Sequence, residues 1–139
     1  MTPPSALSTT TPMARFMMPH PGQRQILRYP ARFKVVACGR RFGKTETGKI
    51  AAIETALRGG RVWWLAPTYQ MAGQVWRDLK AALGPVRISE TEHRLDFHSG
   101  GMIAVRSAHH PDYLRGDGLH LAILDEAAYM EPRIWPEIV

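Results

Sequence analysis

The sequence has 139 residues, of which 45% are apolar and 22% are charged, so it is long enough for one domain with a real core. Its apolar runs are short and no secretory leader is recognisable, which argues against a membrane protein and makes a cytoplasmic location the expectation. Cys38 is the only cysteine, so an intrachain disulfide and a cysteine-based zinc site are both excluded.

The net charge of +6 is unevenly distributed along the chain. Residues 1–50 hold nine Lys and Arg against the single acid Glu46, whereas residues 51–139 hold nine against eleven acids. A basic segment of this kind suits nucleotide or nucleic-acid phosphates, and it is equally typical of a solvated basic face.

The first residues differ in composition from the rest of the chain. Residues 1–19 combine Pro, Ser, Thr and Met without any period, which predicts a disordered leader. A short helix is expected from Pro21 to Tyr29, because Pro-Gly begins it and Pro30 ends it. We therefore expect the folded part to comprise residues 20–139.

Two successive strand–helix units follow. A buried strand is predicted for Val35–Cys38, then a loop, then a helix that carries apolar residues at helical spacing and ends at Gly59-Gly60. The second unit has a strand at residues 61–66 and a helix that begins after Thr68 as its N-cap and ends at Gly84-Pro85.

The spacing of apolar residues changes after this second helix. Residues 86–106 predict a β-meander of short antiparallel strands with a turn at 99–101. The run 119–124 then predicts a fully buried strand that ends in Asp125-Glu126, and a last helix is expected from about Glu131-Pro132.

The loop at Cys38–Thr45, called here the 38–45 loop, follows the pattern G-x-x-x-x-G-K-[ST] with Cys38 at the position of the first glycine. Backbone N–H groups after a strand and the positive end of a helix dipole suit phosphate oxygens. Lys44 would then contact the β- and γ-phosphates of ATP, and Thr45 would bind Mg²⁺. The alternative is an ordinary turn between a strand and a helix.

The acid pair Asp125-Glu126 is the expected partner of such a loop. On a parallel sheet it lies at the edge formed by the carboxyl ends of the strands, where ligands bind. Asp125 would hold Mg²⁺, and Glu126 would orient and deprotonate the water that attacks the γ-phosphate. The alternative is a pair of acids that caps the next helix.

Five segments, in this order and spacing, resemble the N-terminal part of the ATPase domain of tailed-phage terminase large subunits, the motors that package DNA: Pro21–Leu27, Cys38–Thr45, Ala66–Tyr69, Leu114–Gly116 and Leu124–Ala128. The resemblance implies an α/β fold of the P-loop NTPase (RecA-like, ASCE) class. We expect an incomplete three-layer sandwich with a small β-meander before the Asp-Glu strand.

The resemblance also implies how the sheet is completed. In this class, the strand after the Asp-Glu strand lies between it and the phosphate-loop strand. That strand, the coupling motif and the nuclease domain would follow Val139. We therefore expect a fragment or a truncated prophage-like product, which alone hydrolyses ATP weakly or not at all.

Several site residues follow from the resemblance. Gln23 is similar to the glutamine that recognises adenine, and its alternative is a solvent-exposed glutamine on a helix. Either Arg40 or Arg41 is expected as an arginine finger supplied in cis. Arg115 resembles the arginine that related ring motors insert into a neighbour's site, and its alternative is an ordinary surface arginine. Ala66–Tyr69 is similar to a segment that lies near the bound DNA in related helicases. The alternative is an ordinary connection between a strand and a helix. The expected nucleotide-binding set is Gln23, Cys38, Gly39, Arg40, Arg41, Phe42, Gly43, Lys44 and Thr45.

The expected partners are double-stranded DNA, the small terminase subunit, the portal and further copies in a ring, with no membrane. Two other functions remain open, a superfamily 2 helicase-like ATPase and a non-catalytic nucleotide- or DNA-binding remnant. His109-His110 is interpreted as part of a solvated loop, not a metal site. Trp63-Trp64 is expected to pack in the core and on a helix instead of stacking on bases.

Overall fold

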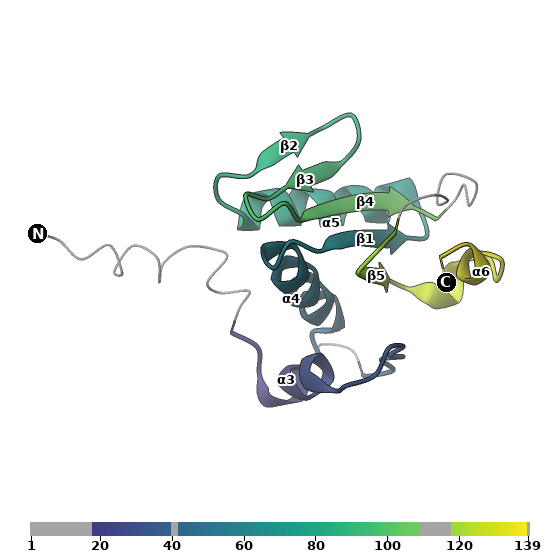
Figure 1. The fold of residues 1–139 in the computed structure, drawn as a ribbon. Helices are drawn as coiled ribbons and strands as arrows, with labels where there is room; N and C mark the ends of the chain where they lie inside the picture. Colours follow the sequence, from purple (N-terminus) through teal and green to yellow (C-terminus); the bar gives the residue numbers. More distant parts are fainter. Residues whose placement is uncertain (1–17, 40–41, 109–117, 139) are drawn as a thin grey trace, which may run out of the picture.

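A computed structural model describes residues 18–39, 42–108 and 118–138 (Figure 1). Its elements in chain order are α3 (Pro21–Arg28), α4 (Lys44–Leu57), β1 (Arg61–Ala66), α5 (Tyr69–Ala82), β2 (Arg87–Ser89), β3 (Arg94–Asp96), β4 (Met102–Ser107), β5 (Leu121–Leu124), the 3₁₀ turn η2 (Ala127–Tyr129) and α6 (Ile134–Ile138). Within these ranges, no helix is long and apolar enough to cross a membrane. The leader predicted for residues 1–19 lies almost entirely outside the described residues.

Local signals set the helix bounds much as predicted. The Thr68 hydroxyl accepts a hydrogen bond from the Met71 N–H at 3.2 Å, so Thr68 caps α5. Just beyond α4, Gly59 takes a φ of +90° that ends the helix. Exchanging an N-cap such as Thr68 for alanine costs about 1 kcal/mol of stability.

The five strands form one mixed sheet in the order β2-β3-β4-β1-β5. The central strand β1 runs parallel to both neighbours, with Trp63 opposite Ala104 of β4 and Ala122 of β5. Strands β2, β3 and β4 pair antiparallel, which is the predicted meander. Because β1, β4 and β5 are parallel, their carboxyl ends meet at one edge of the sheet.

Helices α4 and α5 cover one face of this sheet and enclose the main core. Ile53 from α4, Leu79 from α5, and Trp64 and Ile103 from the sheet are all buried there. Burying a side chain such as Leu79 stabilises the fold by about 1.5–3 kcal/mol. On the other face a smaller cluster, which includes Trp63, packs against Ile134 of α6. The structure is therefore an incomplete three-layer arrangement of the expected class.

The strand predicted for Val35–Cys38 is not present. Residues 34–39 are irregular, Val35 is 96% exposed, and the Phe33 ring meets Trp135 of α6 at a centroid distance of 5.3 Å. A strand needs a partner strand and a packed face, and among the described residues the sheet ends at β5. The prediction of a buried strand is therefore wrong for this structure.

Two further expectations concern burial in the sheet. The sequence predicts a fully buried strand before Asp125, but all four residues of β5 are half-buried, because among the described strands β5 is an edge strand that pairs with β1 alone. Trp63 and Trp64 are both buried, on opposite faces of β1, as expected for core residues. Neither indole is available to stack on a nucleic-acid base.

Candidate functional site

The described part of the 38–45 loop leads directly into α4. Gly43 is the N-cap residue of α4 and adopts the left-handed conformation, with φ 91° and ψ 35°. Among the described residues no side chain caps this helix end, so the N–H groups of its first turn can bind an anion. The helix dipole adds a positive potential at the same place.

The missing first glycine has a simple structural explanation. Among the loop residues described, Gly43 alone has a positive φ, and Cys38 and Gly39 do not. A glycine at the position of Cys38 is therefore not required by the backbone. The Cys38 carbonyl accepts a hydrogen bond from Lys44 Nζ at 2.9 Å, so the lysine side chain reaches back across the loop.

Helix α3 contacts the end of this loop through two side chains. Gln23 is 7% exposed; its Nε2 donates to the Gly43 carbonyl at 3.1 Å, and its Oε1 accepts from the His20 N–H at 2.9 Å. His20 Nε2 lies 2.8 Å from the Phe42 carbonyl. The structure thus places Gln23 beside the loop, with both ends of its amide bonded to backbone groups.

Sequence reasoning missed His20. A weak signal was available, because a polar residue before proline, with glutamine three positions later, has the spacing of a capping box. Histidine is an uncommon N-cap, so the pattern predicts a helix start and nothing about the loop.

Asp125 lies directly after β5, at the edge where the parallel strands end. Its N–H donates to the Leu65 carbonyl at 2.9 Å, which extends the pairing with β1 by one residue. Burial and then the neighbouring Glu126 carboxylate raise the pKa of Asp125, and the ammonium groups of Lys49 and Lys44 oppose them. The first turns of α4 pack on β5, since a Cβ atom added to Gly48 would lie 3.4 Å from Ile123 Cγ2, and this brings the start of α4 toward Asp125.

Glu126 is exposed and has a φ of 52°, the left-handed region that a non-glycine residue rarely adopts. Such a conformation costs of order 1–3 kcal/mol and is often found at functional sites. The backbone turns sharply here, between β5 and η2.

Lys49 is a second residue that sequence reasoning missed. It is 3% exposed on α4, and its Nζ lies 2.9 Å from Glu46 Oε1 and 3.0 Å from Asp78 Oδ2 of α5. Burial alone would lower its pKa, but the carboxylates of Glu46 and Asp78 outweigh burial, so the pKa of Lys49 is raised. No sequence pattern could reveal a partner on another helix.

Other predicted residues divide into two groups. Thr68 serves as a helix cap, which is the structural alternative for Ala66–Tyr69. Arg40, Arg41, Arg115 and His109-His110 lie outside the described residues. Within the described ranges, no three potential metal-binding His, Cys, Asp or Glu side chains form a group.

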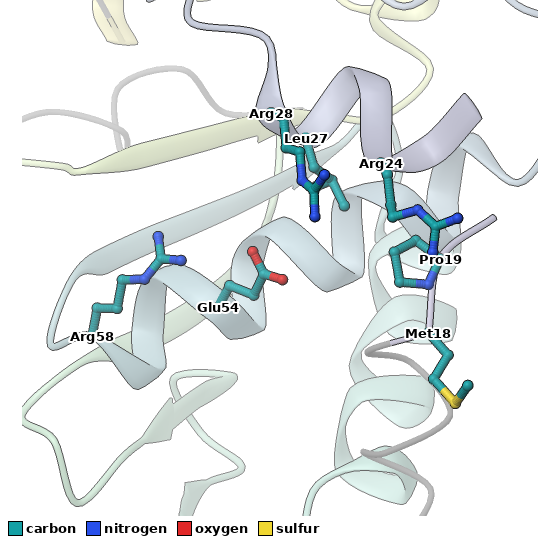
Figure 2. Close-up of a pocket in the computed structure, with 7 residues that line it drawn as sticks. All are labelled: Met18, Pro19, Arg24, Leu27, Arg28, Glu54 and Arg58. Atoms are coloured by element: carbon teal, nitrogen blue, oxygen red, sulfur yellow. The ribbon is translucent and has the colours of Figure 1, made fainter. Parts of the chain in front are cut away.

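A separate cleft of about 560 Å³ lies between α3 and the second half of α4. Figure 2 shows its lining residues: Met18, Pro19, Arg24, Leu27, Arg28, Glu54 and Arg58. Glu54 and Arg58 stand at the opposite end of α4 from Lys44, so this cleft is distinct from the 38–45 loop. Three guanidinium groups and one carboxylate give it a net positive charge.

No protein-family model matches the sequence. Two curated proteins named terminase large subunit, from Thermus phage G20c and Thermus virus P23-45, are each 30% identical to the chain in an alignment of 146 positions that covers 87% of this chain. The chain spans 30% of the length of these relatives.

Solved structures agree with this relationship. The ATPase domain of the large terminase of Thermus phage P74-26 matches with a TM-score of 0.73 at 28% identity, over 89% of this chain and 61% of that one. A substituted form of the same domain gives a TM-score of 0.70. The chain is therefore a homologue of phage terminase large subunits and corresponds to the N-terminal part of their ATPase domain.

Proposed function

We propose that this chain carries the ATP-binding half of a DNA-packaging ATPase, with the 38–45 loop as its phosphate-binding loop (Walker A) and Asp125-Glu126 as its acidic motif (Walker B). The observation that carries the proposal is that the first turns of α4, which begins at Lys44, pack on β5, which ends just before Asp125: a Cβ atom added to Gly48 would lie 3.4 Å from Ile123 Cγ2. The proposed site would thus join two segments 81 positions apart in the chain, at the edge of a parallel sheet where ligands bind.

The loop residues supply the binding of the phosphates. The start of α4 offers N–H donors, and the Lys44 ammonium would exchange its bond to the Cys38 carbonyl for the β- and γ-phosphates. Gln23, beside the end of the loop, is the candidate for adenine recognition. Arg40, Arg41 and Arg115 remain candidates for stabilising charge on the γ-phosphate.

Asp125 and Thr45 suit a Mg²⁺ ion. Placing a half-buried carboxylate next to a second one is unfavourable, as the raised pKa of Asp125 reflects, and a cation would offset that cost. A bound Mg²⁺ would neutralise part of the negative charge of the phosphates. Glu126, exposed beside Asp125, would take the proton of the attacking water as the water adds to the γ-phosphate and ADP leaves.

In the whole protein, hydrolysis would drive translocation of double-stranded DNA in the host cytoplasm, together with a small terminase subunit and a portal. Terminase relatives in both sequence and structure favour this function over a helicase-like one.

Binding of Mg²⁺·ATP by the 139-residue chain tests the proposal. We expect Lys44→Ala to weaken binding at least about tenfold, because it removes a charged phosphate contact. Lys80→Ala, which removes a lysine paired with Glu90 on α5, is the matched control and should bind normally. Equal affinity in Lys44→Ala and the control would refute the proposal.

Measuring phosphate release distinguishes a catalytic ATPase from a non-catalytic nucleotide-binding remnant. We expect weak or no turnover by the isolated chain and Lys44-dependent turnover by a version extended to the full ATPase domain. Tight nucleotide binding without turnover in the extended version would indicate a non-catalytic remnant.

A further inference from the structure

His20 connects the start of α3 to the 38–45 loop. Its Nδ1 faces two backbone N–H groups, those of Gly22 at 3.1 Å and Gln23 at 3.3 Å, and must therefore be the acceptor. The ring proton is then on Nε2, which donates to the Phe42 carbonyl at 2.8 Å. The His20 ring also meets the Phe42 ring edge-on, with centroids 4.9 Å apart.

This contact determines where a loop amide points. In a trans peptide, each N–H is directed away from the carbonyl of the same peptide unit, and the described residues contain no cis peptide bond. When His20 holds the Phe42 carbonyl toward α3, the N–H of Gly43 is turned to the opposite side. Gln23 donates to the next carbonyl, that of Gly43, but this carbonyl also accepts from the Thr47 N–H at 2.8 Å and the Thr47 hydroxyl at 2.7 Å, so α4 itself fixes the Lys44 N–H.

The packing around His20 is close enough to preserve this geometry. A Cβ atom added to Gly22 would lie 3.0 Å from the Phe42 ring and 3.1 Å from His20 Cε1. The loop and α3 can approach this closely because residue 22 has no side chain. Capping α3 would require only the Nδ1 acceptor, which asparagine or serine also provides, whereas the bond to Phe42 requires the second ring nitrogen.

We propose that His20 is a positioning residue for phosphate binding, which orients the Gly43 N–H toward the phosphates through the Phe42 carbonyl. The inference rests on the proposed nucleotide-binding function of the loop. It assigns to α3 a direct effect on phosphate affinity, separate from any recognition of the base.

The substitution His20→Asn tests separately the two hydrogen-bonding roles of the histidine, the cap of α3 and the bond to the Phe42 carbonyl. Asparagine retains an acceptor for the α3 cap but is too short to reach Phe42, whereas His20→Ala loses both bonds. We expect His20→Asn to unfold at nearly the wild-type temperature and to bind Mg²⁺·ADP about 3- to 10-fold more weakly, the effect of removing one hydrogen bond. His98→Asn, in the exposed turn between β3 and β4, is the control and should leave both quantities unchanged.

A second readout needs no nucleotide. Amide hydrogen exchange at Gly43 in the ligand-free chain should be faster in His20→Asn than in wild type, because the peptide between Phe42 and Gly43 reorients more freely. Gly22→Ala should show the same faster exchange with the histidine still in place, because its Cβ displaces Phe42.

These measurements distinguish the possible failures. If His20→Asn binds Mg²⁺·ADP like wild type with unchanged exchange, His20 is only a helix cap and the inference is wrong. The same holds if His20→Asn lowers the unfolding temperature as much as His20→Ala. If wild type binds no nucleotide, the proposed function fails, and the exchange data alone then decide whether His20 orients the loop.

Discussion

Gly43 is the residue of the 38–45 loop whose replacement should have the largest effect on folding. It has a φ of +91°, and a Cβ atom there would lie 2.6 Å from Gln23 Nε2. Gly39, the other described glycine of the loop, has an ordinary φ and no atom within 4 Å of its added Cβ. Gly43→Ala and Gly39→Ala are thus the same chemical change at two very different positions.

The expected cost of Gly43→Ala has two parts. Holding alanine in the left-handed conformation costs about 1–2 kcal/mol. The Gln23 amide must also move, and because it is buried and bonded at both ends, about 0.5–1.5 kcal/mol of hydrogen bonding is lost. We expect a total of about 1.5–3.5 kcal/mol, which is a fall of about 6–14 °C in Tm for a domain of this size.

Thermal unfolding followed by circular dichroism measures this difference directly, with Gly39→Ala as the control. Gly39→Ala should stay within about 0.5 kcal/mol of wild type, as most unstrained exposed substitutions do. Equal stability of Gly43→Ala and Gly39→Ala would show that residue 43 does not require the left-handed conformation, contrary to this prediction. A second check is the double variant with Gln23→Ala, in which the part due to the Gln23 clash should disappear.

Three further changes test other parts of the structure. Because burial and Glu126 raise the pKa of Asp125, the folded state holds this proton more tightly, so the free energy of unfolding falls as pH rises through that pKa. Asp125→Asn should remove this loss in urea titrations at pH values above about 4, the ordinary pKa of an aspartate, and an unchanged pH dependence would contradict it. Asp78→Ala removes one carboxylate partner of the buried Lys49 and should lower the free energy of unfolding by about 1–3 kcal/mol. Breaking a surface pair such as Lys80–Glu90 should lower it by at most about 1 kcal/mol. Equal losses in chemical denaturation would be inconsistent with burial as the cause. The third test concerns the proposed DNA partner, for which the positively charged cleft of Figure 2 is a candidate contact. If the cleft contacts duplex DNA, replacing Arg24 and Arg28 by alanine weakens binding and reduces the salt slope by about 0.9 for each phosphate that is no longer neutralised; an unaltered slope in fluorescence anisotropy would exclude this cleft.

The helices show which parts of the fold are local. Thr68 capping α5, Pro21 beginning α3 and Gly59 ending α4 act within a few residues of their own position in the chain. Their effects depend on neighbouring backbone groups, so the pattern of residues predicts them. Strand β1 likewise occupies the predicted residues 61–66, because a short apolar run between turn signals is typical of a buried strand.

The segment Val35–Cys38 shows the limit of such reasoning. Its residues are good strand formers, yet Val35 is exposed, because a strand exists only when another strand lies beside it. The sequence supports the tendency of this segment to be extended. Whether it pairs depends on residues that are distant in the chain.

The candidate site divides in the same way. The sequence by itself determined the chemical groups: a loop ending in Gly43-Lys44-Thr45, an acid pair after an apolar strand, and a glutamine ahead of both. Only the tertiary structure decided their contacts, namely that Gln23 and His20 bond to loop carbonyls about 20 residues away and that buried Lys49 meets Asp78 of α5. The physical reason is that a motif records which groups are needed, whereas hydrogen bonds and buried ion pairs depend on distances that exist only after the helices have packed on the sheet.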